Sequence, residues 1–507
     1  MRKNTDDSHR TIEVSMNYIS TRGNGSPVSS AQAINLGMVP RGGLFVPKSI
    51  PDISIPFTDN SYQKTAHRVL SSFLTDFSAA ELDDCVGKAY NKTTFDTGSI
   101  IDMKKLSPKL SVMELWHGPT AAFKDVALQI MPHFMQYSKK KIGNKRHTVI
   151  LVATSGDTGK AALEGFKNCD GVSIIVFYPH GGVSEVQRLQ MATTDGANTY
   201  VAAVKGNFDD CQTGVKQIFS DPVFGTELDD NGFELSSANS INWGRLCPQI
   251  AYYFHAYEML IHEGTIRKND PVSFCVPTGN FGDILAGYYA KMMGLPIRRL
   301  ICASNKNNIL SDFFSTGTYD RNRKFYKTNS PSMDILISSN LERFLFEMNG
   351  KNGELIRDWY ASLSKSGTFS VNSSVKNSFD SILLYGWIDE PQVLSTIGKT
   401  FDQTGYILDT HTAVAVAAAE KLGPFDEHVV VASTASPYKF SSDVLRGLGK
   451  TVPEDEFDAV EAISAISATP IHRAVAGLRD KAVRHDQVIE IDQMKQFTKN
   501  IIDNITH

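Results

Sequence analysis

Short apolar runs rich in Val and Ile alternate with helical patterns from about residue 110 onward, and this alternation constrains the fold more than any other feature. A short apolar run followed by a helical pattern is typical of a βαβ unit in a parallel sheet. The predicted strands are 147–153, 172–177, 199–204, 272–276, 299–303 and 429–432. The helices predicted after the first four are 159–167, 184–192, 209–219 and 283–293. The main body of the protein is therefore expected to be α/β.

The chain has 507 residues, which is too long for one simple core, so two or three domains are expected. Helical patterns at 61–74 and 79–91 follow a start marked by Pro and Gly and indicate a mainly helical unit. The predicted division is a flexible extension at 1–15, an N-terminal mainly helical domain at 16–105, an α/β core in two lobes at 106–300 and 400–450, an inserted lobe of helices and loops at 301–400, and a C-terminal helical segment at 451–507.

The composition excludes several classes of protein. A hydrophobic fraction of 41% and a charged fraction of 21% are those of an ordinary globular chain. The formal net charge of -4 gives no basic footprint for nucleic acid, and no run of apolar residues is long enough to cross a membrane. We therefore expect a small-molecule partner.

The cysteines and the amino terminus indicate the compartment. The six cysteines lie far apart without a CxxC pair, so neither a zinc site nor a disulfide framework is predicted, and no metal is expected. Residues 1–14 are polar and charged and lack the apolar core of a signal peptide. A reducing, cytoplasmic location is the prediction.

Two loops, at 154–159 and 277–283, carry Gly beside hydroxyl, amide or carboxylate side chains where a predicted strand leads into a helix. The unpaired backbone N–H groups at such a helix start suit a phosphate. Neither loop matches GxxxxGK[ST] or GxGxxG, so a nucleotide fold is not indicated. For one such loop an ordinary turn is the commoner explanation. Two loops are consistent with two phosphates, or with one phosphate and another polar ligand.

Lys124 lies near the start of a helix predicted to run on past Gln129, in the sequence LWHGPTAAFKD. The helix dipole disfavours a cation at that end, so this lysine should lose its proton more easily than usual. A neutral amine is what attack on an aldehyde requires. On spacing alone, a solvated surface lysine is the commoner explanation.

Together these residues resemble the threonine synthase family, within the tryptophan-synthase-β-like group of pyridoxal phosphate enzymes, and resemble its long fungal and enterobacterial form most. The matching motifs occur in the family's order over nearly the whole chain. They are YISTRG (18–23), GLFVP (43–47), HGPTAAFKD (117–125), TSGDTGKAA (154–162), FDDCQ (208–212), SANSINWGR (237–245), PTGNFGDILAGYYAKMMGLP (277–296), DTHTAVA (409–415) and STASPYKF (433–440).

The resemblance implies a fold-type II enzyme with two open, twisted, largely parallel sheets flanked by helices, plus the N-terminal mainly helical unit. It implies pyridoxal 5'-phosphate as cofactor, with Lys124 as the Schiff-base lysine. The cofactor phosphate would lie against the backbone of Gly279, Asn280, Phe281, Gly282 and Asp283. Thr434 would hydrogen-bond the pyridine nitrogen, and Asp157 stands where relatives often carry Asn beside the cofactor's 3'-oxygen.

The resemblance further implies conversion of O-phospho-L-homoserine and water into L-threonine and phosphate, by γ-elimination and β-addition, with the Lys124 amine moving protons. Arg245 suits a phosphate because its guanidinium is forked, although an interdomain salt bridge is an alternative for it. His117 is more often a structural group than a base. The oligomeric state stays open between monomer and dimer. The candidates to hold the substrate are Ser155, Thr158, Ser240, Asn242 and Arg245.

Four alternatives stay open. A threonine or serine dehydratase would keep Lys124, but it has no phosphate for Ser240 and Arg245 to hold. A phospholyase related to threonine synthase would keep Lys124 and the loop at Gly279. A catalytically silent relative would be expected to lack the lysine, and a nucleotide-binding protein would need a phosphate-loop signature that the sequence does not carry.

Overall fold

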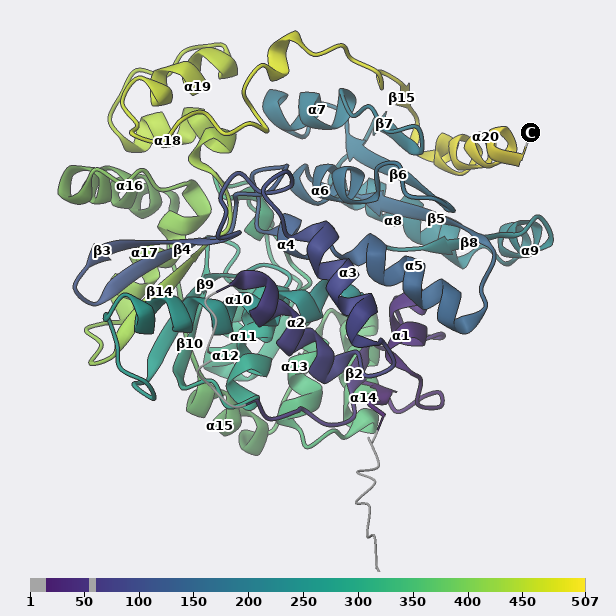
Figure 1. Ribbon diagram of the computed structural model, residues 1–507, viewed down its shortest axis with the longest axis horizontal. Helices are drawn as coiled ribbons and strands as arrows, with labels where there is room; N and C mark the ends of the chain where they lie inside the picture. Colours follow the sequence, from purple (N-terminus) through teal and green to yellow (C-terminus); the bar gives the residue numbers. More distant parts are fainter. Residues whose placement is uncertain (1–14, 54–60, 507) are drawn as a thin grey trace, which may run out of the picture.

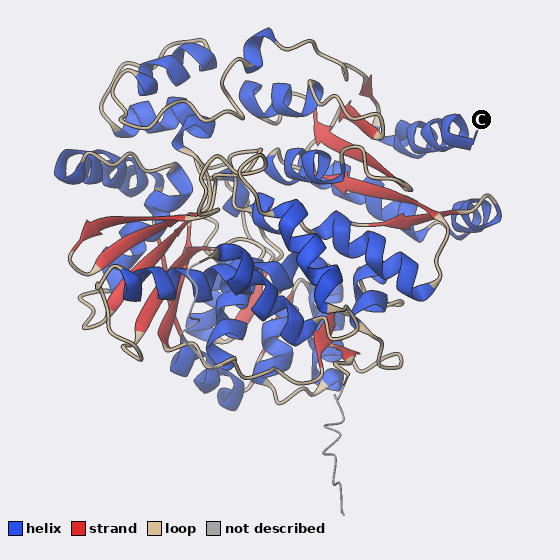
Figure 2. Ribbon diagram, viewed as in Figure 1, coloured by secondary structure: helices blue, strands red, loops and turns tan. Residues whose placement is uncertain are grey.

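Two sheets of mostly parallel strands form the framework of the computed structural model, which describes residues 15–53 and 61–506. The first sheet has six strands in the order β13-β10-β9-β14-β4-β3, and the second has five in the order β15-β7-β6-β5-β8. Figure 1 shows the path of the chain, and Figure 2 shows the strands as two separate groups with loops between them. The predicted fold of two largely parallel sheets is confirmed. The predicted extension at 1–15 lies outside the described residues, except for Ser15.

The second sheet is parallel throughout. Its central strands are mainly apolar because helices cover both faces, and every residue of β6 is buried. Its strands are β5 His147–Ala153, β6 Val172–Pro179, β7 Thr199–Val204, β8 Phe233–Ser236 and β15 Val488–Ile489. The helices of this part are α6 Asp157–Phe166, α7 Glu185–Ala192, α8 Phe208–Ser220, α9 Pro222–Asp230 and α20 Met494–Thr506.

The first sheet is parallel except for the pair β3 and β4, which is antiparallel. β14 enters late in the sequence and lies between β9 and β4. The strands are β3 Asp102–Ser107, β4 Leu110–Glu114, β9 Val272–Pro277, β10 Ile297–Ser304, β13 Leu383–Trp387 and β14 His428–Ser433. The helices that belong to it include α11 Gly282–Met292, α12 Ile309–Thr316, α16 Glu390–Thr404, α17 Thr410–Leu422 and α18 Ser441–Gly447.

A long helix, α10 Trp243–His262, passes through the middle of the molecule and is buried on nearly all sides. The ring of Trp243 lies 5.3 Å from Tyr18, 5.4 Å from Phe73 and 5.6 Å from Tyr289, between ring centroids. This aromatic cluster attaches the N-terminal part to the body. The N-terminal elements are β1 Tyr18–Ser20, α1 Ser30–Leu36, β2 Phe45–Pro47, α2 Tyr62–Phe73 and α3 Ala79–Ala89, and two helices follow β4, α4 Lys124–Leu128 and α5 Met131–Ile142.

The segment 301–400 is not a lobe outside the sheet, so the predicted insertion is corrected. β13 pairs with β10 at the edge of the first sheet. The rings of Phe313, Phe314, Phe344 and Phe379 are buried in the same core as α10 and α11. The prediction of an inserted lobe was wrong because the Ser- and Asn-rich stretches of this segment are loops that connect elements of the core. The other elements of the segment are β11 Thr318–Asp320, η1 Pro331–Met333, α13 Leu341–Met348, α14 Gly353–Ser366, β12 Thr368–Ser370 and α15 Ser373–Ile382.

The C-terminal segment connects the two sheets (Figure 1). It follows η2 Pro437–Phe440 and α18, and it forms α19 Glu456–Ser464 before reaching β15 and α20. Glu456 Oε2 accepts a hydrogen bond from the backbone N–H of Glu185, 2.7 Å away at the start of α7. The segment contains the helices α19 and α20, and it also supplies the edge strand β15. Within residues 15–53 and 61–506, no helix is long and apolar enough to cross a membrane.

Candidate active site

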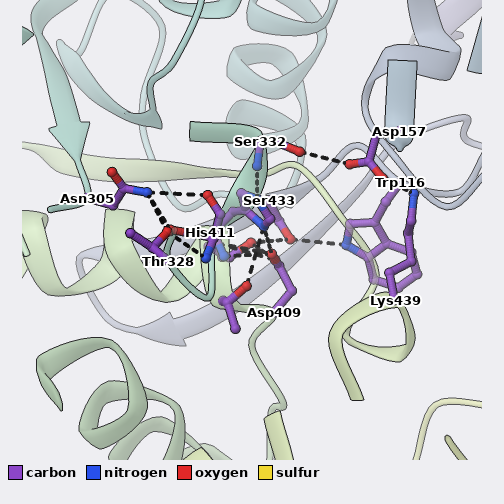
Figure 3. A network of polar contacts seen from close by, with 12 residues as sticks. Trp116, Asp157, Asn305, Thr328, Ser332, Asp409, His411, Ser433 and Lys439 are labelled. Carbon is purple, nitrogen blue, oxygen red and sulfur yellow. Dashed lines mark hydrogen bonds and ion pairs between the residues drawn. The ribbon is translucent and has the colours of Figure 1, made fainter. Parts of the chain in front are cut away.

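The loops that follow the carboxyl ends of β4, β5, β9 and β14 meet between the two sheets. Parallel strands bring their carboxyl ends to one edge, so loops far apart in the sequence converge there. Figure 3 shows the resulting polar network, in which Asp157 from the second sheet faces Ser332 and Lys439 from the first. All motifs that carry the predicted catalytic and cofactor-binding residues lie on these loops.

Lys124 is the first residue of α4, as the sequence predicts, although this helix ends at Leu128 and a separate helix begins at Met131. Its Nζ lies 3.4 Å from Asp157 Oδ2, and its side chain is 12% exposed. Burial lowers the pKa of Lys124, and the charges of Lys439 and Arg245 lower it further, against the opposing effect of Asp157. The shift has the direction that the sequence predicts, toward easier loss of the proton.

Asp157, the first residue of α6, is a buried junction for four side chains. Its Oδ1 accepts from Lys439 Nζ at 2.5 Å and from Gln187 Nε2 at 3.0 Å. Its Oδ2 accepts from Ser332 Oγ at 3.0 Å and from Lys124. Burial alone would raise the pKa of Asp157, but the two lysines hold it well below its usual range. Asp157 is therefore an ionised carboxylate beside Lys124.

The loop 279–283 forms a cradle of backbone N–H groups at the start of α11. Phe281 adopts the left-handed conformation with φ 65° at the helix N-cap, where no side chain bonds to the helix. A non-glycine residue in that conformation is uncommon and is found where the surroundings impose it. Asn280 contributes its backbone carbonyl to Asn340 N, and Ser338 Oγ donates to the carbonyl of Gly279. The loop is fixed in shape while its N–H groups remain available for an anion.

The side chain of Asp283 points away from the cradle and toward α10. One carboxylate oxygen accepts from Tyr252 at 2.6 Å and from Tyr253 at 2.8 Å. The other is buried and has no hydrogen-bond partner among the described residues. Burial raises the pKa of Asp283 to about 6. In this structure Asp283 contributes to the predicted phosphate loop with its backbone.

Thr434 lies directly beside the lysine helix. Its carbonyl oxygen accepts from Phe123 N at 2.9 Å, one residue before Lys124. The neighbouring hydroxyl of Ser433 accepts from Trp116 Nε1 and from Thr412 Oγ1 (Figure 3). By contrast, the hydroxyl of Thr434 is free of partners within the described ranges. It is therefore available to a ligand, which agrees with the role that the resemblance implies.

Arg245 is 3% exposed, so it is not a surface residue. Its Nη1 donates to the carbonyl of Ala238 at 2.5 Å, and its Nε has no partner within the described ranges. No carboxylate of the described residues forms a salt bridge with it, which argues against the interdomain ion pair considered above. Burial lowers the pKa of Arg245 to about 10. A buried guanidinium with an unused donor indicates a site for an anion.

The other predicted substrate-binding residues differ in how many hydrogen bonds their side chains already make to other residues of the protein. Ser155 and Thr158 are half-buried beside Asp157, and Ser240 Oγ lies 3.3 Å from Ser339 Oγ. Asn242 is fully buried and caps α10, where its Oδ1 accepts from Gly244 N. Its Nδ2 donates to the carbonyl of Ile34. Both the oxygen and the nitrogen of the Asn242 side-chain amide thus make hydrogen bonds within the protein. The contact of Asn242 with substrate stays a prediction.

His117 is held by two carboxylates. Its Nδ1 lies 2.8 Å from Asp96 Oδ1 and its Nε2 lies 3.1 Å from Glu114 Oε2. Burial alone would lower the pKa of His117, but the bonds to Asp96 and Glu114 outweigh it and raise the pKa to about 9. Lys104, 4.0 Å from Glu114, adds a second positive charge to this group. His117 is therefore a charged structural residue here, as its predicted role suggests.

The donors around Lys124 fit pyridoxal phosphate. A buried amine of lowered pKa suits the cofactor's aldehyde, and the N–H cradle at 279–282 suits its phosphate. The free hydroxyl of Thr434 suits its ring nitrogen. Lys439, which completes the group, was not predicted from the sequence. The one signal for it is its place in the motif STASPYKF, five residues after the predicted ligand Thr434.

Comparison with known proteins gives the family. Three family models match in order: "Threonine synthase N terminus" over residues 17–90, "Pyridoxal-phosphate dependent enzyme" over 100–434 and "Threonine synthase, C-terminal" over 412–497. The chain is 39% identical to threonine synthase of Pseudomonas aeruginosa, over 86% of this chain and 91% of that protein. It is also 39% identical to threonine synthase-like 1 of Homo sapiens, over 88% of this chain and 62% of that protein.

The first relatives, all threonine synthase-like 1 proteins, are longer than the region they share with this chain, which spans 62% to 66% of their length. Solved structures agree in fold over nearly the whole chain. Threonine synthase from yeast has a TM-score of 0.86 at 33% identity, covering 97% of this chain and 99% of that one. The pyridoxal-phosphate-bound threonine synthase of Brucella melitensis has 0.85 at 35% identity, with 96% and 99% covered. Sequence models, relatives and structures thus agree that the chain belongs to the threonine synthase family of pyridoxal-phosphate dependent enzymes.

Proposed function

We propose that this protein is a threonine synthase, which converts O-phospho-L-homoserine and water into L-threonine and inorganic phosphate. The observation that carries the proposal is Arg245, a buried guanidinium with an unused Nε–H, whose charge acts on Lys124. A dehydratase substrate brings no phosphate to such a donor. A phosphorylated amino acid would place its phosphate there and its amino group near Lys124.

Pyridoxal phosphate, when bound, supplies an electron sink that makes the protons on the substrate's Cα and Cβ acidic. Lys124 would hold its aldehyde, the N–H groups from Gly279 to Asp283 would hold its phosphate, and Thr434 and Asp157 would contact its ring. These residues fix the orientation of the reacting atoms.

Lys124 is the base that we assign to both proton removals. Burial lowers the pKa of its amine, and the positive charges of Lys439 and Arg245 lower it further, so the amine gives up its proton more easily than an ordinary lysine. One amine holds one extra proton, so Lys124 would give up the proton taken from Cα before it removes the Cβ proton, and phosphate then departs from Cγ. A proton would return at Cγ, the hydroxyl of water would add at Cβ and a proton would return at Cα, while the remaining proton of water leaves with phosphate. We assign the proton transfers at these carbon atoms to the one amine.

Arg245 is the first residue that we assign to the leaving phosphate. Ser240 is the second, because it lies beside the loop at 279–283, where its Cβ is 3.9 Å from the position that a Cβ would take at Gly282. Ser155, on the loop before α6, and Thr158, in the first turn of α6, are half-buried beside Asp157, and we assign them to the same phosphate. A guanidinium and hydroxyl donors aimed at one phosphate stabilise the charge that develops as it leaves.

The proposal includes a cytoplasmic location and a small molecule as the only partner of the site. The six cysteines are all free thiols, which supports a reducing compartment. Whether the chain acts as a monomer or a dimer is decided by measuring its mass in solution.

The test measures threonine and phosphate formed from O-phospho-L-homoserine, with L-threonine and O-phosphoethanolamine as comparison substrates. Equal amounts of both products are expected from the wild type, and Lys124→Ala should lose at least about 10³-fold in rate. Phosphate without threonine would identify a phospholyase instead. If nothing turns over and no absorbance appears at about 410–420 nm, where a lysine-bound cofactor absorbs, the cofactor assignment fails as well.

A further inference from the structure

One carboxylate serves two lysines at the centre of the site. Lys439 Nζ lies 2.5 Å from Asp157 Oδ1, whereas Lys124 Nζ lies 3.4 Å from Oδ2. Lys439 is completely buried, and among the described residues its Nζ makes one other hydrogen bond, to the carbonyl of Thr120. The buried ammonium of Lys439 therefore depends on Asp157 for its neutralisation.

The two lysines are not equivalent partners of Asp157. Lys439 makes the shorter contact, and it shares Oδ1 with Gln187, which fixes the carboxylate. Lys124 makes the longer contact and is the residue whose amine must leave Asp157 to hold the cofactor. When Lys124 does so, Asp157 keeps Lys439. The carboxylate thus stays paired in both states.

We propose that Lys439 is a positioning residue, the permanent counter-ion of Asp157, which leaves Lys124 free to act as a neutral amine. This inference rests on the proposed attachment of the cofactor at Lys124. Without Lys439, Asp157 would pair with Lys124 alone and would hold it as an ammonium ion. The amine would then be withheld from the aldehyde until a higher pH.

The other charged groups that face this pair are few among the described residues. Arg245 acts on Lys124 from α10, His411 acts on Asp157 from α17, and Asp125 acts on Lys439 from α4. None of the three replaces Lys439, because no other cationic side chain lies within ion-pair distance of Asp157 in the described ranges apart from Lys124 itself.

The experiment measures binding of pyridoxal phosphate to the apoprotein as a function of pH, from the absorbance of the bound cofactor. Lys439→Met should raise the pH of half-maximal binding by about one unit or more, which weakens binding about tenfold at neutral pH. Asp157→Asn should lower that pH, because Lys439 then repels the charged form of Lys124. Lys439→Arg, which keeps the charge, should stay within about half a unit of the wild type.

The control is Lys160→Met. Lys160 is also a buried lysine with a carboxylate partner, Glu164, and it lies in α6. It forms no ion pair with Asp157. Its loss should leave the pH of half-maximal binding unchanged. The double variant Lys439→Met with Asp157→Asn leaves no unpaired charge, so it should fold and return to within about half a unit of the wild type.

Two results would overturn the inference. One is a shift in the same direction for Lys439→Met and Asp157→Asn. The other is a double variant displaced by more than about one unit, which decides the matter even if a single variant does not fold. If the wild type itself binds no cofactor, the proposed function has failed. If the wild type binds the cofactor and the variants share one pH of half-maximal binding, only the proposed role of Lys439 has failed.

Discussion

The carbonyl oxygen of Ser332 lies 2.8 Å from the position that a Cβ atom would take at Gly279. The turn η1 therefore lies directly on the phosphate loop, and a backbone atom cannot move aside as a flexible side chain can. Gly279→Ala should weaken pyridoxal phosphate binding by about 5- to 150-fold, from the 1 to 3 kcal/mol that such overpacking costs. Absorbance titration of the apoprotein measures this.

The control for that substitution is Gly87→Ala in α3. A Cβ at Gly87 meets no atom within 4 Å, and alanine favours a helix, so this change should leave cofactor binding unchanged. Unchanged affinity in Gly279→Ala would mean that η1 does not rest on the loop in solution.

Arg245→Met should lower kcat/KM for O-phospho-L-homoserine by about 10- to 150-fold, because hydrogen bonds to charged groups contribute about 1.5 to 3 kcal/mol. Inhibition by inorganic phosphate should weaken in parallel, while pyridoxal phosphate binding should change little. The control is Arg188→Met, which removes a surface arginine paired with Glu185. If Arg245→Met lost cofactor affinity and kept phosphate inhibition, Arg245 would serve the cofactor instead.

Asn242→Ala should lower the free energy of unfolding by about 1 to 3 kcal/mol, since it removes the cap of α10 and the donor to Ile34. Thermal denaturation measures the loss. Asn372→Ala, at the cap of α15, is the matched control and should cost about 1 kcal/mol. A raised KM in Asn242→Asp, which keeps the capping oxygen, would instead support the predicted contact with substrate.

His117 predicts a pH dependence of stability. Its pKa is raised to about 9 in the folded protein, above the ordinary value of 6.5. The stabilisation is therefore complete below pH 6.5 and is lost as the pH rises through 9. The unfolding free energy of the wild type should exceed that of His117→Gln by up to about 3 kcal/mol at low pH, and the difference should shrink toward pH 10.

Denaturant unfolding from pH 6 to 10 measures this difference. The control is His147→Gln, because burial lowers the pKa of His147, which is the opposite of the shift at His117. A difference for His117→Gln that does not change with pH would show that packing, and not charge, holds His117 in place.

The strands β5, β6 and β7 of the second sheet could be predicted from the sequence because they are almost wholly buried, which leaves mainly apolar runs such as β6. The short edge strands β8 and β15 were not predicted. Burial is also the reason why the helix α10 was not predicted. Apolar residues surround that helix, so it has no polar face and shows no helical period. The strand β13 was not predicted for the opposite reason, since this edge strand is only half-buried and lies within a polar stretch.

The sequence could predict those site residues that lie in its motifs. Lys124, Asp157 and the loop at Gly279 each follow a strand, so their convergence follows from parallel pairing. The partnership of Asp157 with Lys439 could not be predicted, because the two residues are 282 positions apart and come from different sheets. Only the packing of one sheet against the other brings them together.

The position of β14 between β9 and β4 has a consequence for synthesis on the ribosome. β4 is translated early, but its parallel neighbour follows about 300 residues later, which takes about 15 to 60 s at cellular elongation rates. Meanwhile the strands β5 to β8 can pair as soon as they emerge. The nascent chain thus carries an open β-edge at Leu110–Glu114 through most of its translation, and a second at Val272–Pro277 once β9 is made. These edges are where a chaperone would be needed to prevent aggregation.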